Sequence, residues 1–136
     1  MGILVRALNA NDYDEILVGW WNDWGFDAPS RDFLPQDGTG GLIVFDGDDP
    51  VCAGFMYATN SKVAWIEWII SSKTYRKKPT RREAIDLLIY TLTNICKNKD
   101  VKYVYSSNDN KNLIDCFTKS GFKKGSTNLT ELIKIF

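Results

Sequence analysis

A group of cationic side chains lies directly before a segment with a helical pattern and could bind an anion. Five of the chain's 17 Lys and Arg residues fall there: Arg76, Lys77, Lys78, Arg81 and Arg82. The first N–H groups of a helix are free to donate, and the helix dipole adds about half a positive charge at the same place. The junction between strand and helix therefore predicts a site for a phosphate-bearing ligand.

Acid–base chemistry in this chain has to proceed without histidine, because the sequence contains none. That excludes Ser-His and Cys-His nucleophile pairs, His metal sites and His acid–base catalysis, and we expect no metal site. Glu67 is the best candidate base. Strand alternation places it on one face with Val63, Trp65 and Ile69, and a partly buried apolar face would raise the pKa of a carboxyl. The alternative interpretations of Glu67, a solvated edge residue or a structural ion pair, stay open.

Length and composition indicate a single globular domain covering residues 1–136. Hydrophobic residues make up 44% of the chain and charged residues 25%, and the formal net charge is zero. A chain of this length can bury one sizeable core. Attraction to nucleic acid would have to come from the local basic patch, because overall charge supplies none.

Cysteine usage and the terminal sequence favour a cytoplasmic location. Cys52, Cys96 and Cys116 each lie in an apolar stretch, so buried free thiols are favoured over a disulfide or redox site. The first residues are interrupted by Arg6 and are too short for a signal-peptide core. No apolar run approaches the ~20 residues of a membrane helix. We therefore expect a cytoplasmic protein without membrane contact.

The elements that must position these residues follow one another closely. Strands are expected at residues 3–8, 41–45, 51–58, 63–71, 101–106 and 129–136. Helices are expected at residues 13–25, from residue 80 through Lys97 and Lys99, and at residues 110–120, with a short helical turn near 30–33. Thr80 and Glu83 match a capping box. The order β, α, β, β, β, α, β, α, β predicts an α/β fold with a mixed sheet.

The last helix carries a diagnostic set of residues. It opens with N-x-x-L at residues 110–113 and ends in FTKSGF at residues 117–122. With the preceding strand, basic turn and crossover helix, these residues resemble the GNAT superfamily of acyl-CoA-dependent N-acyltransferases over essentially the whole chain. The Trp-rich first helix and WIEW at residues 65–68 also resemble small uncharacterised bacteriophage GNAT-like proteins, whose compartment would be the host cytoplasm. The resemblance implies a mixed, mainly antiparallel sheet whose central parallel strands splay at the cofactor cleft, flanked by helices.

The resemblance also implies a cofactor, acetyl-CoA or another acyl-CoA. Its pantetheine arm would bond to the backbone of the fourth strand, and its pyrophosphate would lie on the following loop and helix start. The cofactor-binding residues would be Trp68, Ile69, Ile70, Arg76, Lys77, Lys78, Arg81, Arg82, Glu83, Ala84, Asn110 and Phe117. Pro79 and Arg82 replace the Arg or Gln and the Gly of the family's usual loop signature. Arg82 could therefore obstruct the pyrophosphate or bind it directly, and a merely solvated basic helix start is the third interpretation.

The implied reaction is direct attack of an amine on the acyl-CoA thioester in a ternary complex. Glu67 would act as the base. The family's usual Tyr proton donor is replaced here by Phe117, which cannot donate. Tyr105, Tyr75 or water would then protonate the leaving thiolate, or catalysis would rest on proximity alone.

The acceptor site of this family lies among the first helix, the loop after it and the hairpins. The candidate substrate-binding residues here are Trp24, Phe26, Asp27 and Asp32, with Phe33 and Asp37 in the same loop. Aromatic rings and carboxylates suit a cationic or aromatic amine on a small molecule or peptide, although tryptophans at helical spacing are also typical of a core. A homodimer through the last strands is expected from relatives. A degenerate fold that binds a protein, or a nucleic-acid-binding protein, are the alternative functions.

Overall fold

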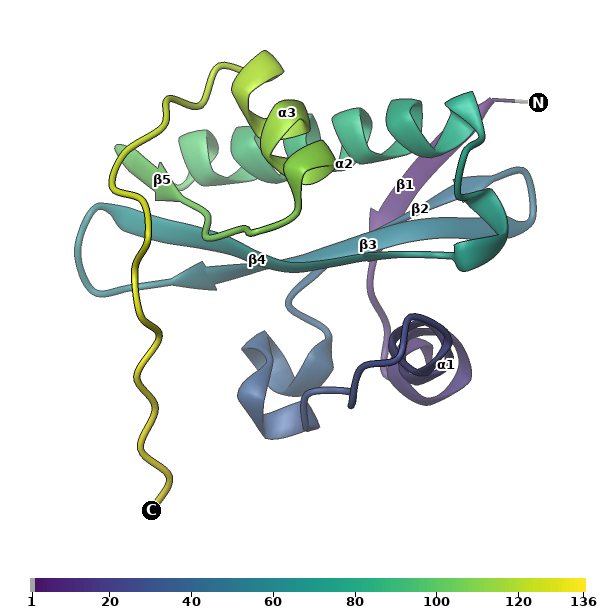
Figure 1. Ribbon diagram of the computed structural model, residues 1–136, viewed down its shortest axis with the longest axis horizontal. Coiled ribbons are helices and arrows are strands. Elements are labelled where there is room, and N and C mark those ends of the chain that lie inside the picture. Colours follow the sequence, from purple (N-terminus) through teal and green to yellow (C-terminus); the bar gives the residue numbers. More distant parts are fainter. Residues whose placement is uncertain (1) are drawn as a thin grey trace.

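The computed structural model describes residues 2–136 and, within them, a single five-stranded sheet. Its strands are β1 Ile3–Ala7, β2 Gly41–Asp46, β3 Asp49–Ala58, β4 Val63–Ser71 and β5 Tyr103–Tyr105, in that spatial order (Figure 1). Neighbouring strands pair antiparallel except β4 and β5, which are parallel. Both the mixed sheet and its mainly antiparallel character are confirmed.

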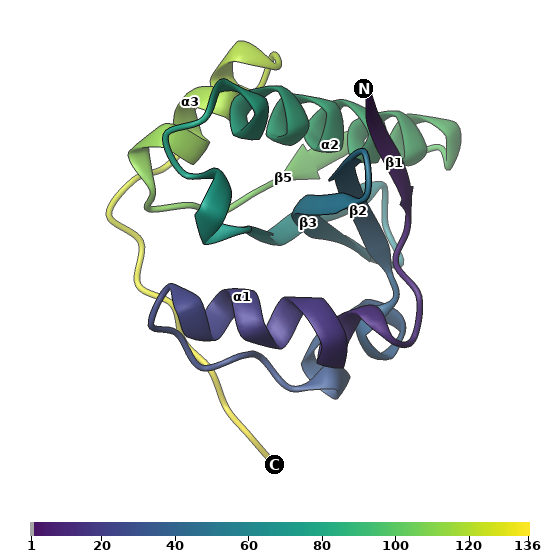
Figure 2. The ribbon, with the colours of Figure 1, turned by 90° about the vertical axis from the view of Figure 1, so that its right-hand side faces the viewer.

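Helices cover both faces of this sheet (Figure 2). The helix α1 Val18–Asp23 continues a π-helical turn and lies on one face together with the 3₁₀ turns Arg31–Phe33 and Pro35–Gly38. The helices α2 Pro79–Asn98 and α3 Lys111–Lys119 lie on the other face. The 20-residue α2 is the crossover that a parallel β4–β5 pair requires.

Two apolar clusters, one on each face of the sheet, form the core. On the α2 side, Leu88 and Ile89 are fully buried against β2, β3 and β4, and on the α1 side Trp20 and Trp21 pack on Phe55. Burial of side chains of this size stabilises the fold by about 2–3 kcal/mol each. The first two tryptophans of the helical stripe are thus core residues. All three cysteines are free and buried, as expected.

A β-bulge interrupts β4 at the point where it leaves β5. Phe55 pairs with Glu67 but Ala53 pairs with Ile70, so Trp68 and Ile69 together oppose a single residue of β3. Trp68 has a φ of 60°, a left-handed conformation typical of bulges and turns.

The extra residue reverses the alternation of β4. Ile66 and Ile69 both pack in the α2-side cluster, whereas Glu67 lies opposite Phe55 of the α1-side cluster. The prediction that Glu67 shares a face with Ile69 is therefore wrong. Val63 and Trp65, which precede the bulge, do share the face of Glu67.

β4 and β5 separate after a short parallel ladder. The last pair is Trp65 with Tyr105, and β4 continues to Ser71 beyond it. The backbone edge of the continuing part faces the gap. The expected splay of the parallel strands is confirmed, with β5 as the edge strand of the sheet.

Two further expectations are wrong at the level of elements. Residues 129–136 form no strand: the segment passes the end of β4 and extends away from the sheet to the C-terminus (Figure 1), and a strand needs a partner. The helix α2 begins at Pro79, with Lys78 as its N-cap and no side-chain cap. Proline suits the first helical position because its fixed φ is helical and its missing N–H is not needed there, so Thr80 lies inside the helix and forms no capping box.

Candidate functional site

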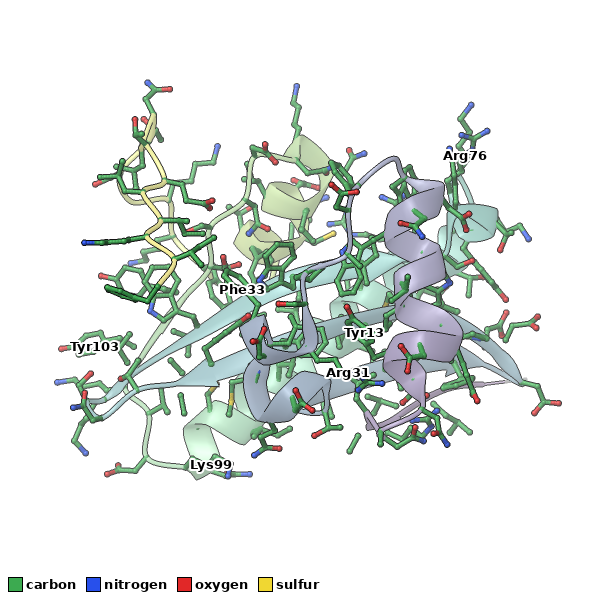
Figure 3. All side chains as sticks on the ribbon, turned by 90° about the horizontal axis from the view of Figure 1, so that it is seen from below. Tyr13, Arg31, Phe33, Arg76, Lys99 and Tyr103 are labelled. Carbon is green, nitrogen blue, oxygen red and sulfur yellow. The ribbon has the colours of Figure 1, made fainter. Side chains whose placement is uncertain are left out.

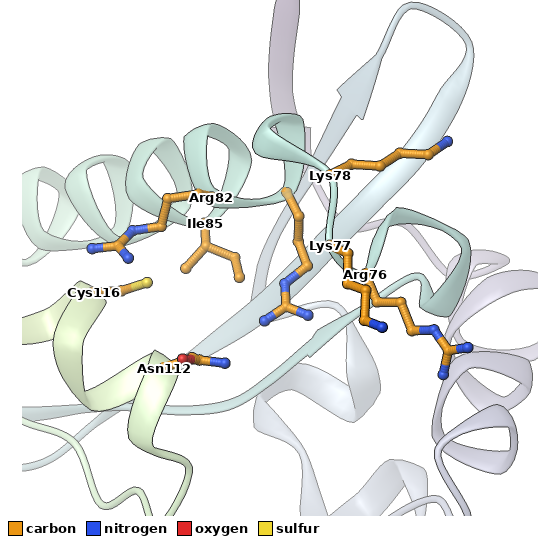
Figure 4. A pocket seen from close by; sticks show the side chains of 8 residues that line it. Arg76, Lys77, Lys78, Arg82, Ile85, Asn112 and Cys116 are labelled. Atoms are coloured by element: carbon orange, nitrogen blue, oxygen red, sulfur yellow. The ribbon is translucent and has the colours of Figure 1, made fainter.

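The predicted cations come together around a cavity between the start of α2 and α3 (Figure 4). The cavity has a volume of about 330 Å³. Its lining residues are Arg76, Lys77, Lys78, Arg81, Arg82, Ile85, Asn112 and Cys116. The volume is at the lower end of the range of small-molecule sites, and the lining charge favours an anionic ligand.

Arg82 is held by acidic side chains of both helices. Its Nε lies 3.3 Å from Asp86 Oδ1 and its Nη1 lies 3.2 Å from Asp115 Oδ2, which also lies 3.4 Å from Lys119 Nζ. The hydrogen bond from Arg82 lowers the pKa of Asp115. Arg82 thus ties α2 to α3, and its charge is already balanced.

The other cations of the cavity carry no such ion pairs. Within residues 2–136, Arg76, Lys77, Lys78 and Arg81 lie outside the 4.0 Å range of any carboxylate. These four residues supply the uncompensated positive charge.

Of the remaining predicted loop and helix residues, Glu83 is exposed and Ala84 is fully buried, and neither side chain lines the cavity.

The loop that carries these cations is anchored through Tyr75. Its ring is buried, its hydroxyl donates to Asp46 Oδ2 at 3.1 Å, and Lys78 Nζ lies 4.9 Å from the ring centroid. Burial and the two carboxylates of the β2–β3 turn raise the pKa of Tyr75 to about 12. The hydroxyl of Tyr75 is therefore committed to the hairpin, which removes it as the proton donor. Lys77, two residues after Tyr75 in the same loop, has a φ of 66° and therefore a left-handed backbone conformation.

Glu67 lies where β4 and β5 separate. Its Oε1 accepts from Ser107 N at 2.6 Å and from Ser106 Oγ at 3.3 Å. Ser106 Oγ has a single proton, which it shares between Glu67 Oε1 and the closer Ile66 O at 2.6 Å, and it accepts from Asn108 Nδ2 at 2.8 Å. Ser106 thereby links β4 to the segment after β5 where the backbone ladder has ended.

The environment of Glu67 favours its neutral form. Burial raises its pKa, the hydrogen bonds from Ser107 and Ser106 oppose the rise, and the charge of Glu131 adds to it. Among residues 2–136 no cation lies within ion-pair distance of Glu67, so the ion-pair interpretation is wrong. A half-buried carboxyl with a raised pKa is a stronger base than an exposed one.

Tyr105 ends β5 on the same sheet face as Glu67. Its ring lies 4.9 Å from the ring of Trp65, its partner in the parallel ladder, and it is half exposed. Phe117, by contrast, is buried against Phe122 with 4.9 Å between ring centroids. Asn110 caps α3, since its side-chain oxygen accepts from Leu113 N at 3.0 Å.

The predicted pantetheine residues occupy the part of β4 beyond its last β5 pair. The bulge turns the side chain of Trp68 toward α1, where it makes edge-to-face contacts with Trp21 and Phe33 at 6.2 and 5.7 Å. Ile69 and Ile70 face opposite clusters of the core. The backbone of these three residues borders the gap.

The predicted acceptor residues do not form one group. Trp24 Nε1 donates to Ser71 O at 2.8 Å, which fixes the end of α1 to the end of β4. Asp32 accepts from Ser30 Oγ, and Phe26 and Asp27 are exposed in the loop after α1.

Sequence reasoning missed several residues of this region. Asn112 and Cys116 line the cavity from α3, and their spacing of four on a helix was the available signal. Burial raises the pKa of the Cys116 thiol, which keeps it neutral. Ser106, Ser107 and Asn108 form a polar run directly after a strand, but only the fold reveals that they contact Glu67.

The splayed mixed sheet flanked by helices is the GNAT acetyltransferase fold. No protein-family model and no curated protein matches the sequence. Solved structures match along nearly its whole length. Glucosamine-6-phosphate N-acetyltransferase from Arabidopsis thaliana is 11% identical with a TM-score of 0.67, over 98% of this chain and 100% of that chain.

Two further structures give the same result. A probable acetyltransferase from meticillin-resistant Staphylococcus aureus is 15% identical with a TM-score of 0.69, over 99% of this chain and 100% of that chain. AAC(6')-Iy, in complex with the bisubstrate analogue CoA-S-monomethyl-acetylneamine, is 13% identical with a TM-score of 0.68, over 99% of this chain and 100% of that chain. TM-scores of this size over nearly the whole of both chains establish the fold.

None of the helices within residues 2–136 is both long and apolar enough to cross a membrane. The same residues contain no group of three or more His, Cys, Asp or Glu side chains arranged to hold a metal ion.

Proposed function

We propose that this chain is an acyl-CoA-dependent N-acyltransferase that moves an acetyl or similar acyl group to an amine. The observation that carries the proposal is the arrangement along β4. A basic cavity follows its carboxyl end, and Glu67 lies where β5 departs, with the unpaired edge of β4 between them. A relative of this fold binds an analogue that joins CoA to its acceptor. The proposal places the reaction in the cytoplasm.

The cofactor would lie along that edge. The backbone of Trp68, Ile69 and Ile70 would bond to the pantetheine arm, because those groups border the splay. The pyrophosphate would lie in the cavity against Arg76, Lys77, Lys78 and Arg81. Charge-assisted bonds of this kind contribute about 1.5–3 kcal/mol each. Arg82 would hold the cavity walls together rather than bind phosphate.

The chemistry would proceed by direct attack. Glu67 accepts a proton from the acceptor ammonium, and the neutral amine nitrogen then attacks the thioester carbonyl carbon. The new C–N bond forms, the attacking nitrogen releases its second proton to water, and the C–S bond breaks. The leaving thiolate takes a proton from water or from Tyr105, which is reprotonated from solvent, and Glu67 returns its proton to solvent. Phe117 has no part in proton transfer because it is a buried apolar residue.

Calorimetry with acetyl-CoA tests the cofactor site. Wild-type protein should bind with micromolar affinity, and Arg76→Glu with Arg81→Glu should weaken binding at least about tenfold, since two favourable phosphate contacts become repulsive. Lys97→Glu with Lys99→Glu, at the far end of α2, is the charge-matched control. The proposal is contradicted if the wild-type protein binds no acetyl-CoA. It is also contradicted if the two double variants bind acetyl-CoA with equal affinity.

A further inference from the structure

The sheet face below Glu67 carries aromatic side chains that α1 does not cover. Phe33, Trp68 and Tyr105 are 46%, 37% and 54% exposed, although each contacts another aromatic ring. Phe33 projects from its 3₁₀ turn beside the strands in the view from below (Figure 3). Exposed aromatics gathered in one region are uncommon on a folded surface unless they contact a ligand or partner.

The rings on one side of Glu67 are held in place. Trp68 is fixed edge-to-face between the buried Trp21 and the exposed Phe33. The backbone of Phe33 is fixed in turn, because its carbonyl accepts from Tyr57 Oη at 2.9 Å. Rings that are already ordered lose little conformational freedom when a ligand binds.

A second aromatic pair lies on the other side of Glu67. Trp65 is two residues before Glu67 on the same face of β4, and its ring packs against that of Tyr105 with 4.9 Å between centroids and an interplanar angle of 40°. The carboxyl thus lies between the pair Phe33–Trp68 and the pair Trp65–Tyr105 along the strand.

The charge of this region selects a cation. Burial raises the pKa of Glu67, and the repulsion between the negative charges of Glu67 and Glu131 in this region raises it further. Lys62, just before β4, is already paired with Asp100 at 2.6 Å. Aromatic faces add attraction for an ammonium group. Of the predicted loop carboxylates, Asp32 already accepts from Ser30 Oγ and Asp27 is exposed in the loop after α1, whereas Glu67 is half-buried and would bind a single ammonium group.

We propose that the acceptor is a monoamine carried on a flat aromatic group. Its ammonium binds Glu67 and its ring packs against Phe33 and Trp68 or against Trp65 and Tyr105. This inference rests on the proposed function for the reaction that follows binding, but it makes a separate statement about which ligand this surface takes.

Binding is tested without acyl-CoA. The probes are 2-phenylethylamine and its saturated analogue 2-cyclohexylethylamine, which have the same charge and linker and differ in the flat ring. Titration followed by the indole N–H signals in ¹H–¹⁵N spectra should show about tenfold tighter binding of the aromatic amine and a shift of the Trp68 signal. Equal affinities, or shifts that leave Trp68 and Trp65 unmoved, overturn the inference.

Variants assign the surface. Trp68→Ala should weaken binding of 2-phenylethylamine about tenfold, and Phe33→Leu, an exposed position that does not threaten folding, should weaken it about threefold. Tyr90→Ala removes an aromatic ring that is 64% exposed on α2 and is the matched control. Loss of binding in the control alone, or in no variant, contradicts the assignment.

Turnover separates this inference from the proposed function. With acetyl-CoA, 2-phenylethylamine should be acetylated with a higher kcat/KM than neamine, an amino sugar with several ammonium groups. Preference for neamine overturns the inference and leaves the acyltransferase intact. Binding of 2-phenylethylamine without any acetyl-CoA binding or transfer supports the ligand class and overturns the proposed function.

Discussion

At the scale of single residues, the environment of Glu67 is what separates this carboxyl from the other acidic side chains. It is half-buried, accepts two hydrogen bonds, and lies where the parallel strands part. Its pKa lies above its usual value because burial outweighs those bonds. The sequence could identify Glu67 as a candidate base through its place in an apolar strand. It could not identify Ser106 and Ser107, because their contact with Glu67 spans about forty residues and depends on strand pairing.

Glu67→Gln should lower kcat about 10²-fold or more at pH 7, because general-base catalysis contributes roughly that much. Glutamine keeps an oxygen that can accept from Ser107, so the fold should survive. Because the folded-state pKa is raised, ionisation of Glu67 costs stability as the pH rises through it. The variant should therefore gain thermal stability relative to wild type above that pKa, and gain none below the ordinary value of 4.5. Glu15→Gln, at an exposed position, is the control; unchanged turnover in Glu67→Gln would remove Glu67 as the base.

Ser106→Ala should shift the acidic limb of the pH–rate profile to higher pH. The hydroxyl shares its proton between Ile66 O and the Glu67 carboxylate, so its loss removes part of what stabilises the ionised form and raises the pKa of Glu67 further. Ser107→Ala is a matched control, since the bond from residue 107 comes from its backbone N–H and persists. The pKa can be measured directly from the carboxyl ¹³C shift of Glu67, and equal values in the two variants would contradict a positioning role for Ser106.

At the scale of elements, local pattern predicted most of the strands and helices, and departures came from contacts between elements. Alternation and turn residues defined β2, β3 and β4, and Gly121 follows α3 with a φ of 99°, the left-handed conformation that commonly ends a helix. The bulge at Trp68 had no such signal, because a bulge is a property of register between two strands. The basic loop was predicted, but the ion pairs that remove Arg82 from it depend on where α3 docks.

The loop before α2 contains a backbone strain that a single substitution can test. Lys77 has a φ of 66°, a conformation that costs a non-glycine residue roughly 1–2 kcal/mol, while glycine adopts it freely at some cost in chain entropy. Lys77→Gly should therefore raise Tm by about 2–4 °C. Lys78→Gly, at a φ of −96°, relieves nothing and should lower Tm. Calorimetric scans of both variants measure the difference, and an equal loss in both would show that no strain is stored at Lys77.

At the scale of the whole molecule, the segment 129–136 is the feature that the fold leaves unpaired. Leu129, Leu132, Ile133, Ile135 and Phe136 are 60–105% exposed. β5 has one partner, β4, so its outer edge is also open. The sequence was right that this segment has strand-like residues, but a strand forms only where a partner supplies its backbone hydrogen bonds.

The chain with residues 129–136 present should form a homodimer in which this segment of each copy pairs with the open edge of β5 in the other. Light scattering after size exclusion should give twice the mass of the chain at micromolar concentration, and deletion of residues 129–136 should give a monomer. Leu4→Lys, which removes an apolar side chain that is 67% exposed on β1, is the control and should stay dimeric.

A disulfide trap distinguishes this arrangement from pairing within one chain. Tyr105→Cys combined with Ile133→Cys should oxidise to a dimer-sized band on a non-reducing gel. A monomer-sized product with the same bond would show that the segment folds back on its own β5.

The short ladder between β4 and β5 also affects the order in which the parts of the molecule fold. The strands β2, β3 and β4 follow one another along the chain and pair antiparallel. The three pairs of the β4–β5 ladder, by contrast, join residues that are forty positions apart in the sequence. Contacts across such a separation form late in folding and open at low free-energy cost in the native state. The gap that would hold the cofactor therefore exists only once the last strand has docked. A ligand that contacts both β4 and β5 would replace the hydrogen bonds that the two strands do not make with each other. Ligand binding and the docking of β5 would then be coupled.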